Sequence, residues 1–590
     1  MQGLKQRQIS FLGPTVVFLT IGLAIYGHVL HGEFVSDDYQ AIVDNKAVQN
    51  GDLWGIWLTF NTRFLTGLTF WLNARWGQMD TYGFHLVNIL LHVVNAFLVH
   101  AFVTATFQTP AMRREGLAES VSRPVAFFAA LIFLCHPVQT EAAAFITQRT
   151  SLLATFFYLA TCLLYIRGRA SGRGMFFFVS WGTMLWGVFS KELTLTLPFV
   201  LLLYEFYFFG FQGLGWKRSA RIFFPYFLLL ALVPAVLWLD NDPSSVLELK
   251  SQMSTGGFRW QYVLTEANVW RTYLRLVILP VNLNHDYDYP VAKTLWDPGT
   301  MFSLALLAVI AVWAAAQFSR RRLVSFGIFW FFLTVTVETL VVCFVHRQML
   351  YEHWLYLPMA GAAVVLSFLA MELPRSPKAG KLVLTALVVV FSMMSYQRNL
   401  VWREEVAFWQ DAVQKSPRKP SAHFALGTAY YRKDEFEKAY YHLKKALALH
   451  DSRTKKGEIG IDYLLMTGLH NNLGIIYFLY GDDDMAVASF QEAVQWDPEN
   501  GRPYNNLALL YFNLGDCAKT IDNFQLAVQK MGEYGEAVFR IGQCQLRLGD
   551  EAGGRENLPK AVELLIKEGR LDEARQVQKA FPAQVSPEKK

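Results

Sequence analysis

Two adjacent aspartates, Asp37 and Asp38, are the residues of this sequence whose types and spacing point most directly to chemistry. They follow the first long apolar run, Ile9 to Leu30, within the stretch Gly32 to Ile42. Neighbouring carboxylates repel each other, and burial raises the pKa of a carboxyl group. Such a pair at the mouth of a membrane segment is expected to act as a general base, to bind a cation or to lie in a solvated loop. The elements that position the pair decide among these three roles.

Composition places the aspartates in a membrane protein. Of the 590 residues, 53% are hydrophobic and only 17% are charged, whereas a soluble chain carries about 25% charged residues. Apolar runs crowd residues 1–400, and residues 401–590 have the composition of a soluble helical domain. We therefore predict an all-α fold with a polytopic helical membrane domain over 1–400 and a water-soluble domain over 401–590. The net charge of +6 comes from basic residues in short loops, which suits membrane orientation better than nucleic-acid binding.

Eleven apolar segments are predicted to span the membrane, a crossing requiring about 20 apolar residues. These segments are 10–30, 84–107, 124–137, 151–167, 174–190, 193–210, 222–240, 300–318, 323–345, 354–372 and 382–397. Segment 262–281 is also apolar, but Glu266, Arg271 and Arg275 interrupt it, so we predict an amphipathic helix at the interface. With eleven crossings, nearly every basic cluster in the loops falls on the inner side. The C-terminal domain then lies outside, on the side of Asp37 and Asp38.

In this orientation, ionisable residues collect at the outer ends of the helices. Besides the aspartates they are His136, Glu141, Arg149, Lys191, Glu192, His285, Asp286, Asp288, His346, Arg347, Glu352 and His353. Each one singly suits a snorkelling or capping residue, but ionisable groups at the ends of membrane helices also mark polar sites. Because they share one side, we predict that they line a cavity.

One predicted span carries a polar stripe. His85, Asn88, His92 and Asn95 follow at spacings of three, four and three, which places them on one helical face. We predict that they form interhelical hydrogen bonds rather than a catalytic site.

The soluble half contains a repeat of about 34 residues. Its registers are marked by Leu426-Gly427, Leu473-Gly474, Leu507-Ala508 and Ile541-Gly542, and the predicted repeats are 420–453, 467–500, 501–534 and 535–568. Small residues at these positions let the two helices of a hairpin approach closely. The spacing is that of the tetratricopeptide repeat, whose solenoids present a concave groove for extended peptides or partner proteins. A stabilising cap or an oligomer contact is the alternative role.

Several short stretches, taken in order, resemble one family. They are Phe34-Val35-Ser36-Asp37-Asp38, His85 to His92, His136-Pro137-Val138-Gln139-Thr140-Glu141, Gln148-Arg149, Ser190-Lys191-Glu192, Tyr273-Leu274-Arg275, Asp286-Tyr287-Asp288-Tyr289-Pro290 and Leu355-Tyr356-Leu357-Pro358. With the trailing repeats they resemble the transmembrane and tetratricopeptide repeat-containing O-mannosyltransferases and their bacterial relatives. The resemblance covers nearly the whole chain and implies the GT-C architecture of membrane glycosyltransferases.

The resemblance implies transfer of mannose or another hexose from a polyprenyl phosphate to Ser/Thr hydroxyls of exported proteins, with Asp37 or Asp38 as the base of an inverting reaction. The donor phosphate would be held by Arg149, Lys191, Arg347 and His353. Carboxylates that would orient the acceptor or sugar, or pair with these cations, are Glu141, Glu192, Asp286, Asp288 and Glu352. Relatives often have Glu-Arg before the Leu-Tyr-Leu-Pro segment, whereas this chain has Glu352-His353. If that arginine binds the phosphate in relatives, another cation does so here.

The expected partners are a lipid-linked sugar donor, the lipid bilayer and a protein acceptor bound by the repeats. The carboxylates suit Mg²⁺ or Mn²⁺, but no ligand spacing demands a metal. The expected location is a bacterial inner membrane with periplasmic repeats, or the endoplasmic reticulum with lumenal repeats. Two other functions fit the pattern: an oligosaccharyl- or glycolipid-modifying transferase of the same architecture, and a non-enzymatic membrane-anchored repeat scaffold.

Overall fold

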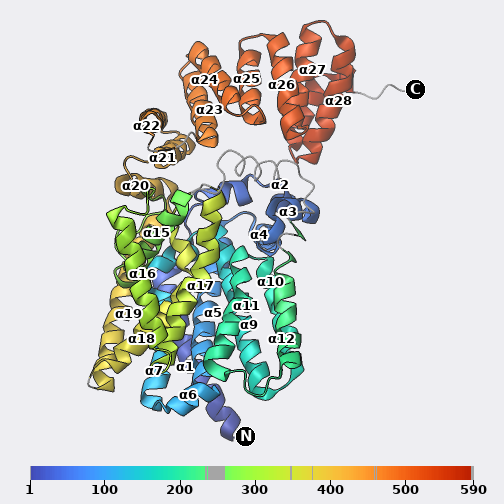
Figure 1. The fold of residues 1–590 in the computed structure, drawn as a ribbon. Coiled ribbons are helices and arrows are strands. Elements are labelled where there is room, and N and C mark those ends of the chain that lie inside the picture. Colours follow the sequence, from blue (N-terminus) through green and yellow to red (C-terminus); the bar gives the residue numbers. More distant parts are fainter. Residues whose placement is uncertain are drawn as a thin grey trace. The chain divides into compact units, whose positions relative to one another are not determined.

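The structure is a computed structural model that describes residues 2–232, 235–236, 260–345, 348–374, 376–457, 459 and 462–585. Within these ranges the secondary structure is helical, and the described residues form no β-strand. The predicted all-α fold class is therefore confirmed. The chain divides into two compact units, Met1–Lys415 and Ser416–Lys590, which are described separately below (Figure 1).

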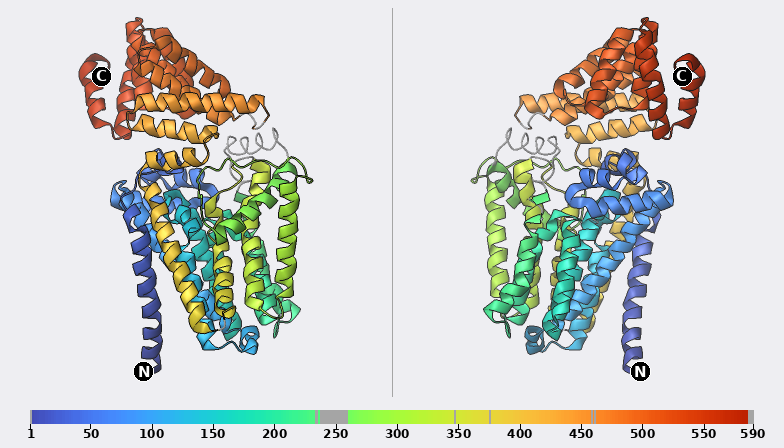
Figure 2. Two further views of the ribbon diagram at one scale, coloured as in Figure 1. Left: turned by 90° about the vertical axis from the view of Figure 1, so that its left-hand side faces the viewer. Right: turned by 90° about the vertical axis from the view of Figure 1, so that its right-hand side faces the viewer.

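The first unit is a bundle of long helices that run side by side (Figure 2). They are α1 (Gln2–Tyr26), α5 (Thr81–Phe107), α7 (Glu119–Cys135), α9 (Arg149–Ser171), α10 (Gly174–Val188), α11 (Leu197–Tyr204), α12 (Trp216–Leu229), α16 (Pro298–Ala316), α17 (Arg322–Val345), α18 (Pro358–Glu372) and α19 (Pro377–Leu400). Each predicted span overlaps one of these helices. Segment 193–210 also overlaps the 3-10 turn η6 (Glu192–Thr196) and the π-helix η7 (Glu205–Phe209), and the end of segment 222–240 falls largely outside the described residues.

Six helical segments of the described residues are long and apolar enough to cross a membrane. A seventh arises if Glu119–Cys135 and Pro137–Ala144, which are bent by 53° at Pro137, count as one span. The segments Gly13–Val29, Gly174–Val188 and Pro358–Glu372 are apolar but shorter. The eleven crossings therefore stay a prediction.

Small residues allow α17 and α18 to pack backbone against backbone. A Cβ added to Gly361 would lie 2.5 Å from the carbonyl oxygen of Gly327, so neither position accommodates a side chain without a shift. The indole of Trp330 on α17 donates a hydrogen bond to the carbonyl of Leu357, at 3.2 Å. Close approach of this kind stabilises helix pairs in membranes, where lipid tails remove the hydrophobic drive for association.

Helices α2 (Lys46–Asn50), α3 (Leu53–Phe60) and α4 (Phe64–Gly77) lie together at one end of the bundle (Figure 1). The remaining elements of the loops are the π-helix η2 (Tyr39–Val43), the 3-10 turn η3 (Asn61–Arg63), α8 (Thr140–Ala144), the longer helix α15 (Trp260–Ile278) and the 3-10 turn η8 (Glu352–Leu355). Side-chain caps begin α2 and α3: Asn45 accepts from the amides of Ala47 and Val48, and Asp52 accepts from that of Trp54. A separate small core formed by Ile42, Val48, Ile56, Phe70, Phe84 and Ile146 packs η2, α2, α3 and α4 against the start of α5 and the segment before α9.

The ambiguous segment 262–281 is helical as α15, and its depth in a membrane stays a prediction. At the end of the first unit, α20 (Glu405–Lys415) follows α19 and precedes the second unit.

The second unit is a series of helix hairpins. They are α21 (Pro420–Arg432) with α22 (Phe436–Lys455), α23 (Tyr463–Leu479) with α24 (Asp483–Trp496), α25 (Gly501–Asn513) with α26 (Cys517–Met531), and α27 (Gly535–Arg547) with α28 (Glu551–Lys567), followed by α29 (Leu571–Ala580) and α30 (Pro582–Val585). Gly474 shows why a small residue recurs, since a Cβ there would lie 2.7 Å from the ring of Phe490 in the paired helix. Helix α22 has 20 residues, against 14 in α24, and it extends two residues past the end of the first predicted repeat.

Candidate active site

The two aspartates differ in their surroundings. Asp38 is fully buried, and its carboxyl oxygens accept hydrogen bonds from the backbone amides of Val35 at 3.1 Å and Thr147 at 2.9 Å. Asp37 is exposed, and the Ser36 hydroxyl donates to it at 3.3 Å. Ser36 has a φ of 50°, an uncommon conformation for a residue other than glycine. One aspartate therefore faces solvent while its neighbour is enclosed by protein.

Burial governs the protonation of Asp38. It raises the pKa of this carboxyl group to about 8, although the amides of Val35 and Thr147 act in the opposite direction by stabilising the charged form. Asp38 joins the loop that follows α1 to the segment between α8 and α9. It therefore has the contacts of a positioning residue, and Asp37 has the accessibility that a base requires.

The same loop is fastened to the end of the first unit. The amide of Glu33 donates to the carbonyl of Arg403 at 3.0 Å, and the Glu33 carboxylate accepts from the amide of Glu405 at 3.0 Å. The hydroxyl of Tyr39 donates to the Glu405 carboxylate at 3.1 Å. Elements separated by more than 360 residues in sequence thus fix the loop that carries the aspartates.

Arg149 lies fully buried at the start of α9 and is enclosed by hydrogen-bond acceptors. Its guanidinium donates to the Asn88 and Asn73 side chains at 2.8 and 2.5 Å, to the Phe84 carbonyl at 2.8 Å, and to the carbonyl and hydroxyl of Thr69 at 3.3 Å. These bonds tie α4, α5 and α9 together. The predicted contact of Arg149 with a donor phosphate stays a prediction, and this geometry favours a positioning role.

Lys191 and Glu192 each pair with a residue that sequence reasoning missed. The Lys191 ammonium lies 2.7 Å from the Glu338 carboxylate, and it also donates to the Ser151 hydroxyl at 3.1 Å. Glu192 accepts two hydrogen bonds from Arg63, at 3.3 and 3.1 Å. The lone carboxylate of Glu338 inside an apolar predicted span was the available signal for the first pair.

Glu141 connects two histidines. One carboxylate oxygen lies 3.0 Å from His285 Nδ1 and 3.2 Å from His353 Nδ1, and the other accepts from the His353 amide at 2.9 Å. Burial by itself lowers the pKa of both imidazoles. For His285 the hydrogen bond and charge of Glu141 outweigh burial and hold the pKa above its ordinary value, whereas for His353 burial prevails. The geometry thus favours one charged and one neutral histidine around a single carboxylate.

Glu352, which precedes His353, is buried and anchors the loop before α16. Its carboxylate accepts from the Asn284 amide at 2.5 Å and from the Tyr287 hydroxyl at 2.7 Å. Asp286 lies buried in that loop and Asp288 lies exposed in it. Arg347 and His346 lie outside the described residues.

Electrostatic interactions join these groups into one cluster at the loop-bearing end of the bundle. Asp37 acts on both Arg63 and His285, Glu338 acts on both Arg63 and His353, and Lys191 acts on His353. We call Asp37, Arg63, Glu141, Lys191, Glu192, His285, Glu338 and His353 the ionisable cluster. Its members come from seven separate segments of the first unit. That the predicted ionisable residues line a cavity stays a prediction.

The polar stripe of α5 has the structural role predicted for it. Asn88 donates to the carbonyls of Phe145 and Ile146 at 3.2 Å, and Asn95 donates to that of Leu152 at 2.9 Å. His92 Nδ1 lies 2.8 Å from the Tyr356 hydroxyl. The prediction of interhelical hydrogen bonds is confirmed for these three residues.

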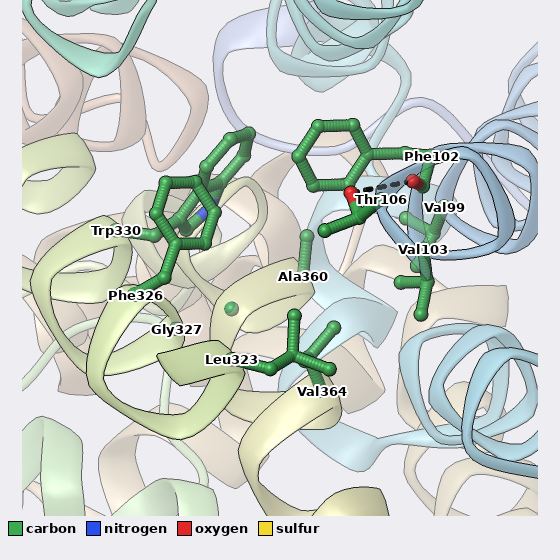
Figure 3. A pocket seen from close by; sticks show the side chains of 11 residues that line it. Val99, Phe102, Val103, Thr106, Leu323, Phe326, Gly327, Trp330, Ala360 and Val364 are labelled. Carbon is green, nitrogen blue, oxygen red and sulfur yellow. Dashed lines mark hydrogen bonds between the residues drawn. The ribbon is translucent and has the colours of Figure 1, made fainter. Parts of the chain in front are cut away.

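An apolar cavity lies between α5, α17 and α18, away from the ionisable cluster (Figure 3). It offers about 10 Å³ to the centre of a water-sized sphere, close to the minimum that one water requires. The Thr106 hydroxyl on its wall already donates to the Phe102 carbonyl, at 2.8 Å. The cavity is therefore a packing void, too small for a sugar or a lipid chain.

No group of three or more histidine, cysteine, aspartate or glutamate side chains in the described part of the chain is arranged to hold a metal ion.

The sequence of this chain is similar to those of known proteins. Protein O-mannosyl-transferase F38B6.6 of Caenorhabditis elegans is 24% identical over 433 residues, which cover 70% of this chain and 59% of the relative. Protein O-mannosyl-transferase TMTC1 of Homo sapiens is 27% identical over 494 residues, which cover 72% of this chain and 54% of the relative. The chain thus spans little more than half the length of these curated relatives. They confirm the resemblance inferred from the motifs and, with the apolar helices, indicate an integral membrane protein.

The tetratricopeptide repeat family matches residues 467–500, the second predicted repeat. Among solved structures, the crystal structure of MamA aligns with 28% of this chain and 90% of its own, at 19% identity and a TM-score of 0.24.

Proposed function

We propose that this chain is a membrane glycosyltransferase that moves a sugar from a polyprenyl-phosphate donor to serine or threonine hydroxyls of exported proteins. The observation that carries the proposal is the exposed carboxylate of Asp37, held beside buried Asp38 and within the electrostatic reach of Arg63 and His285. A plain membrane anchor has no need of such a cluster. The names of the relatives support a protein acceptor and mannose as the sugar.

In the proposed reaction, the Asp37 carboxylate accepts the proton of an acceptor hydroxyl while the hydroxyl oxygen attacks the anomeric carbon of the donor sugar. The bond between that carbon and the phosphate oxygen breaks, and its electron pair leaves with the lipid phosphate. Attack from the side opposite the phosphate inverts the anomeric centre. Because the leaving phosphate is already a weak base, cations that stabilise its charge replace a general acid.

Asp37 and Asp38 have different roles in this reaction. Asp38 holds the loop through the amides of Val35 and Thr147, and Asp37 performs the proton transfer. Lys191 would contribute positive potential near the phosphate and His353, as a neutral imidazole, a hydrogen bond. Arg347 remains proposed as a second cation for the phosphate. Asp286, Asp288 and Glu352 would help to orient the sugar or the acceptor.

The central test supplies the donor and looks for the product. Membranes containing the chain are expected to transfer mannose from polyprenyl-phosphate mannose to exported proteins, and mass spectrometry would locate the sugar on serine or threonine. Matched membranes without the chain are the control. Donors bearing several sugars should be used poorly. An exported proteome with identical glycosylation in both membranes would contradict the proposal, and preferential use of multi-sugar donors would favour an oligosaccharyltransferase.

We propose that the second unit recruits the protein acceptor from the same aqueous compartment. Tethering an acceptor raises its effective concentration at the site without altering the chemistry. Deleting residues 416–590 is therefore expected to slow modification of a folded protein acceptor by about 10- to 100-fold. Initial rates would be measured on the full acceptor and on a short serine- and threonine-containing peptide from it.

The short peptide serves as the control because it is too small to gain from the repeats. Its rate should change by less than about threefold, which is small beside the loss expected for the folded acceptor. If both substrates lose activity equally, the repeats stabilise the first unit rather than recruit an acceptor.

A further inference from the structure

Arg63 occupies a position in the ionisable cluster that its pairing with Glu192 does not fully explain. It lies in η3, between α3 and α4, and the amide of Leu65 at the start of α4 donates to the Phe189 carbonyl at 3.1 Å. This contact fixes the α3–α4 hairpin against the end of α10. The guanidinium is thereby brought to the segment that carries Lys191 and Glu192.

The Arg63 side chain is held on one edge and accessible on another. Its Nε and Nη2 donate to the two oxygens of Glu192, at 3.3 and 3.1 Å. The Thr62 hydroxyl donates to Glu192 at 2.8 Å and helps to fix the carboxylate. The Arg63 side chain nevertheless remains 46% exposed, and within the described ranges its hydrogen bonds to protein come from Nε and Nη2 alone. An arginine fixed by one bidentate partner can present its remaining N–H groups in a defined direction.

The surroundings of Arg63 suit a membrane surface. The preceding helix α3 exposes the large apolar side chains of Leu53, Trp54 and Leu58 by 52%, 68% and 50%, and Trp76 near the end of α4 is 80% exposed. Tryptophan concentrates where the hydrocarbon of a bilayer meets its head groups. Arg63 lies in the turn between the two helices that carry these exposed apolar side chains, a position that suits contact with lipid phosphates.

We propose that Arg63 binds the phosphate of the lipid-linked donor at the membrane surface and stabilises it as the leaving group, with Glu192 as the residue that orients the guanidinium. This inference rests on the proposed function, because it names the residue that grips the donor of that reaction. Asp37, which interacts electrostatically with Arg63, would then lie on the acceptor side of the same phosphate-linked sugar.

The test measures binding without turnover. Sugar-free polyprenyl monophosphate would be titrated onto the purified full chain in detergent, and the dissociation constant would be determined for the wild type and for variants. Arg63→Gln is expected to weaken binding by about 10- to 100-fold, the loss associated with a charge-assisted contact. Arg63→Lys should recover part of the affinity through its charge but not through a paired contact.

Two further variants separate phosphate binding from architecture. Glu192→Gln breaks the same ion pair but removes no contact with the phosphate. It is therefore expected to weaken binding by less than about threefold, far less than Arg63→Gln does. Arg75→Gln removes an exposed cation from the same hairpin and should leave binding unchanged. If Glu192→Gln and Arg63→Gln weaken binding equally, or if Arg63→Gln binds as tightly as the wild type, Arg63 is only structural.

The binding measurement does not depend on whether the chain transfers sugar, so the two proposals can fail separately. A wild-type chain that binds polyprenyl monophosphate through Arg63 but transfers no sugar would refute the proposed function and leave this site intact. A wild-type chain that transfers sugar, with a KM for the donor unaltered in Arg63→Gln, would refute the site and leave the function intact. Absence of any binding by the wild type would overturn the assignment of Arg63.

Discussion

Replacement of Asp37 by asparagine is expected to lower the rate of sugar transfer by about 10²- to 10⁴-fold, the usual contribution of a general base. Asparagine preserves the shape of the side chain but cannot accept the acceptor proton. The exposed position of Asp37 means that the substitution disturbs no buried contact, so the unfolding temperature should stay unchanged. The measurement is the initial rate with saturating donor, together with a thermal unfolding curve in detergent.

Asp38→Asn provides the informative contrast. Both carboxyl oxygens of Asp38 accept backbone N–H bonds, and an amide would turn an NH₂ group toward one of those donors. This variant should therefore lose thermal stability as well as activity. Asp44→Asn, in an exposed position of the same loop, is the matched control and should retain both. A near-normal rate of transfer in the Asp37→Asn variant would exclude Asp37 as the base.

Truncation of Glu141 to alanine is expected to destabilise the first unit by about 3–5 kcal/mol, the cost of breaking a buried ion pair on one side. The change would leave the His353 amide and the imidazole of His285 without their acceptor. Three segments meet at this carboxylate: α8, the loop before α16, and η8. Thermal unfolding should shift accordingly, and the loop around His285 should become accessible to proteolysis.

The pairing of Glu141 with His285 also predicts that the stability of the protein depends on pH. The pKa of His285 in the folded protein lies above its ordinary value of 6.5, so the stability from its protonated form is full below about pH 6.5. That stability is lost as the pH rises through the raised pKa, and the Glu141→Ala variant should lack this part of the pH dependence. Glu119→Ala, which breaks an ion pair that is 77% exposed on both sides, should cost less than about 0.5 kcal/mol. An equal shift in both variants would mean that the cluster contributes no specific stability.

Local periodicity determined the architecture that the sequence alone could predict. Each apolar segment lies on a helix because a chain that buries its backbone in lipid must satisfy its hydrogen bonds within the segment. The helix hairpins of the second unit follow the recurrence of Gly427, Gly474 and Gly542; a Cβ would force the paired helix to shift at the first two and would be tightly packed at the third. The role of Asn88, His92 and Asn95 could also be predicted, because helical spacing fixes which residues share a face.

The candidate site was predicted only in part. Sequence reasoning identified the side of the molecule and most of the ionisable residues, but it did not distinguish Asp37 from Asp38, and it missed Arg63 and Glu338. Nothing in the local pattern separates two adjacent aspartates. Only the approach of the Thr147 amide buries one of them and leaves the other exposed.

Long-range packing decided the partners of each charge. Asp38 meets Thr147, Arg63 meets Glu192 and Lys191 meets Glu338, and each pair joins residues more than 100 positions apart. The sequence by itself determined which segments are helices and how their faces are composed, because those properties depend on neighbours within a few turns. Tertiary structure decided which carboxylate is exposed and which cation is accessible, because burial and pairing depend on helices that meet only in the folded bundle.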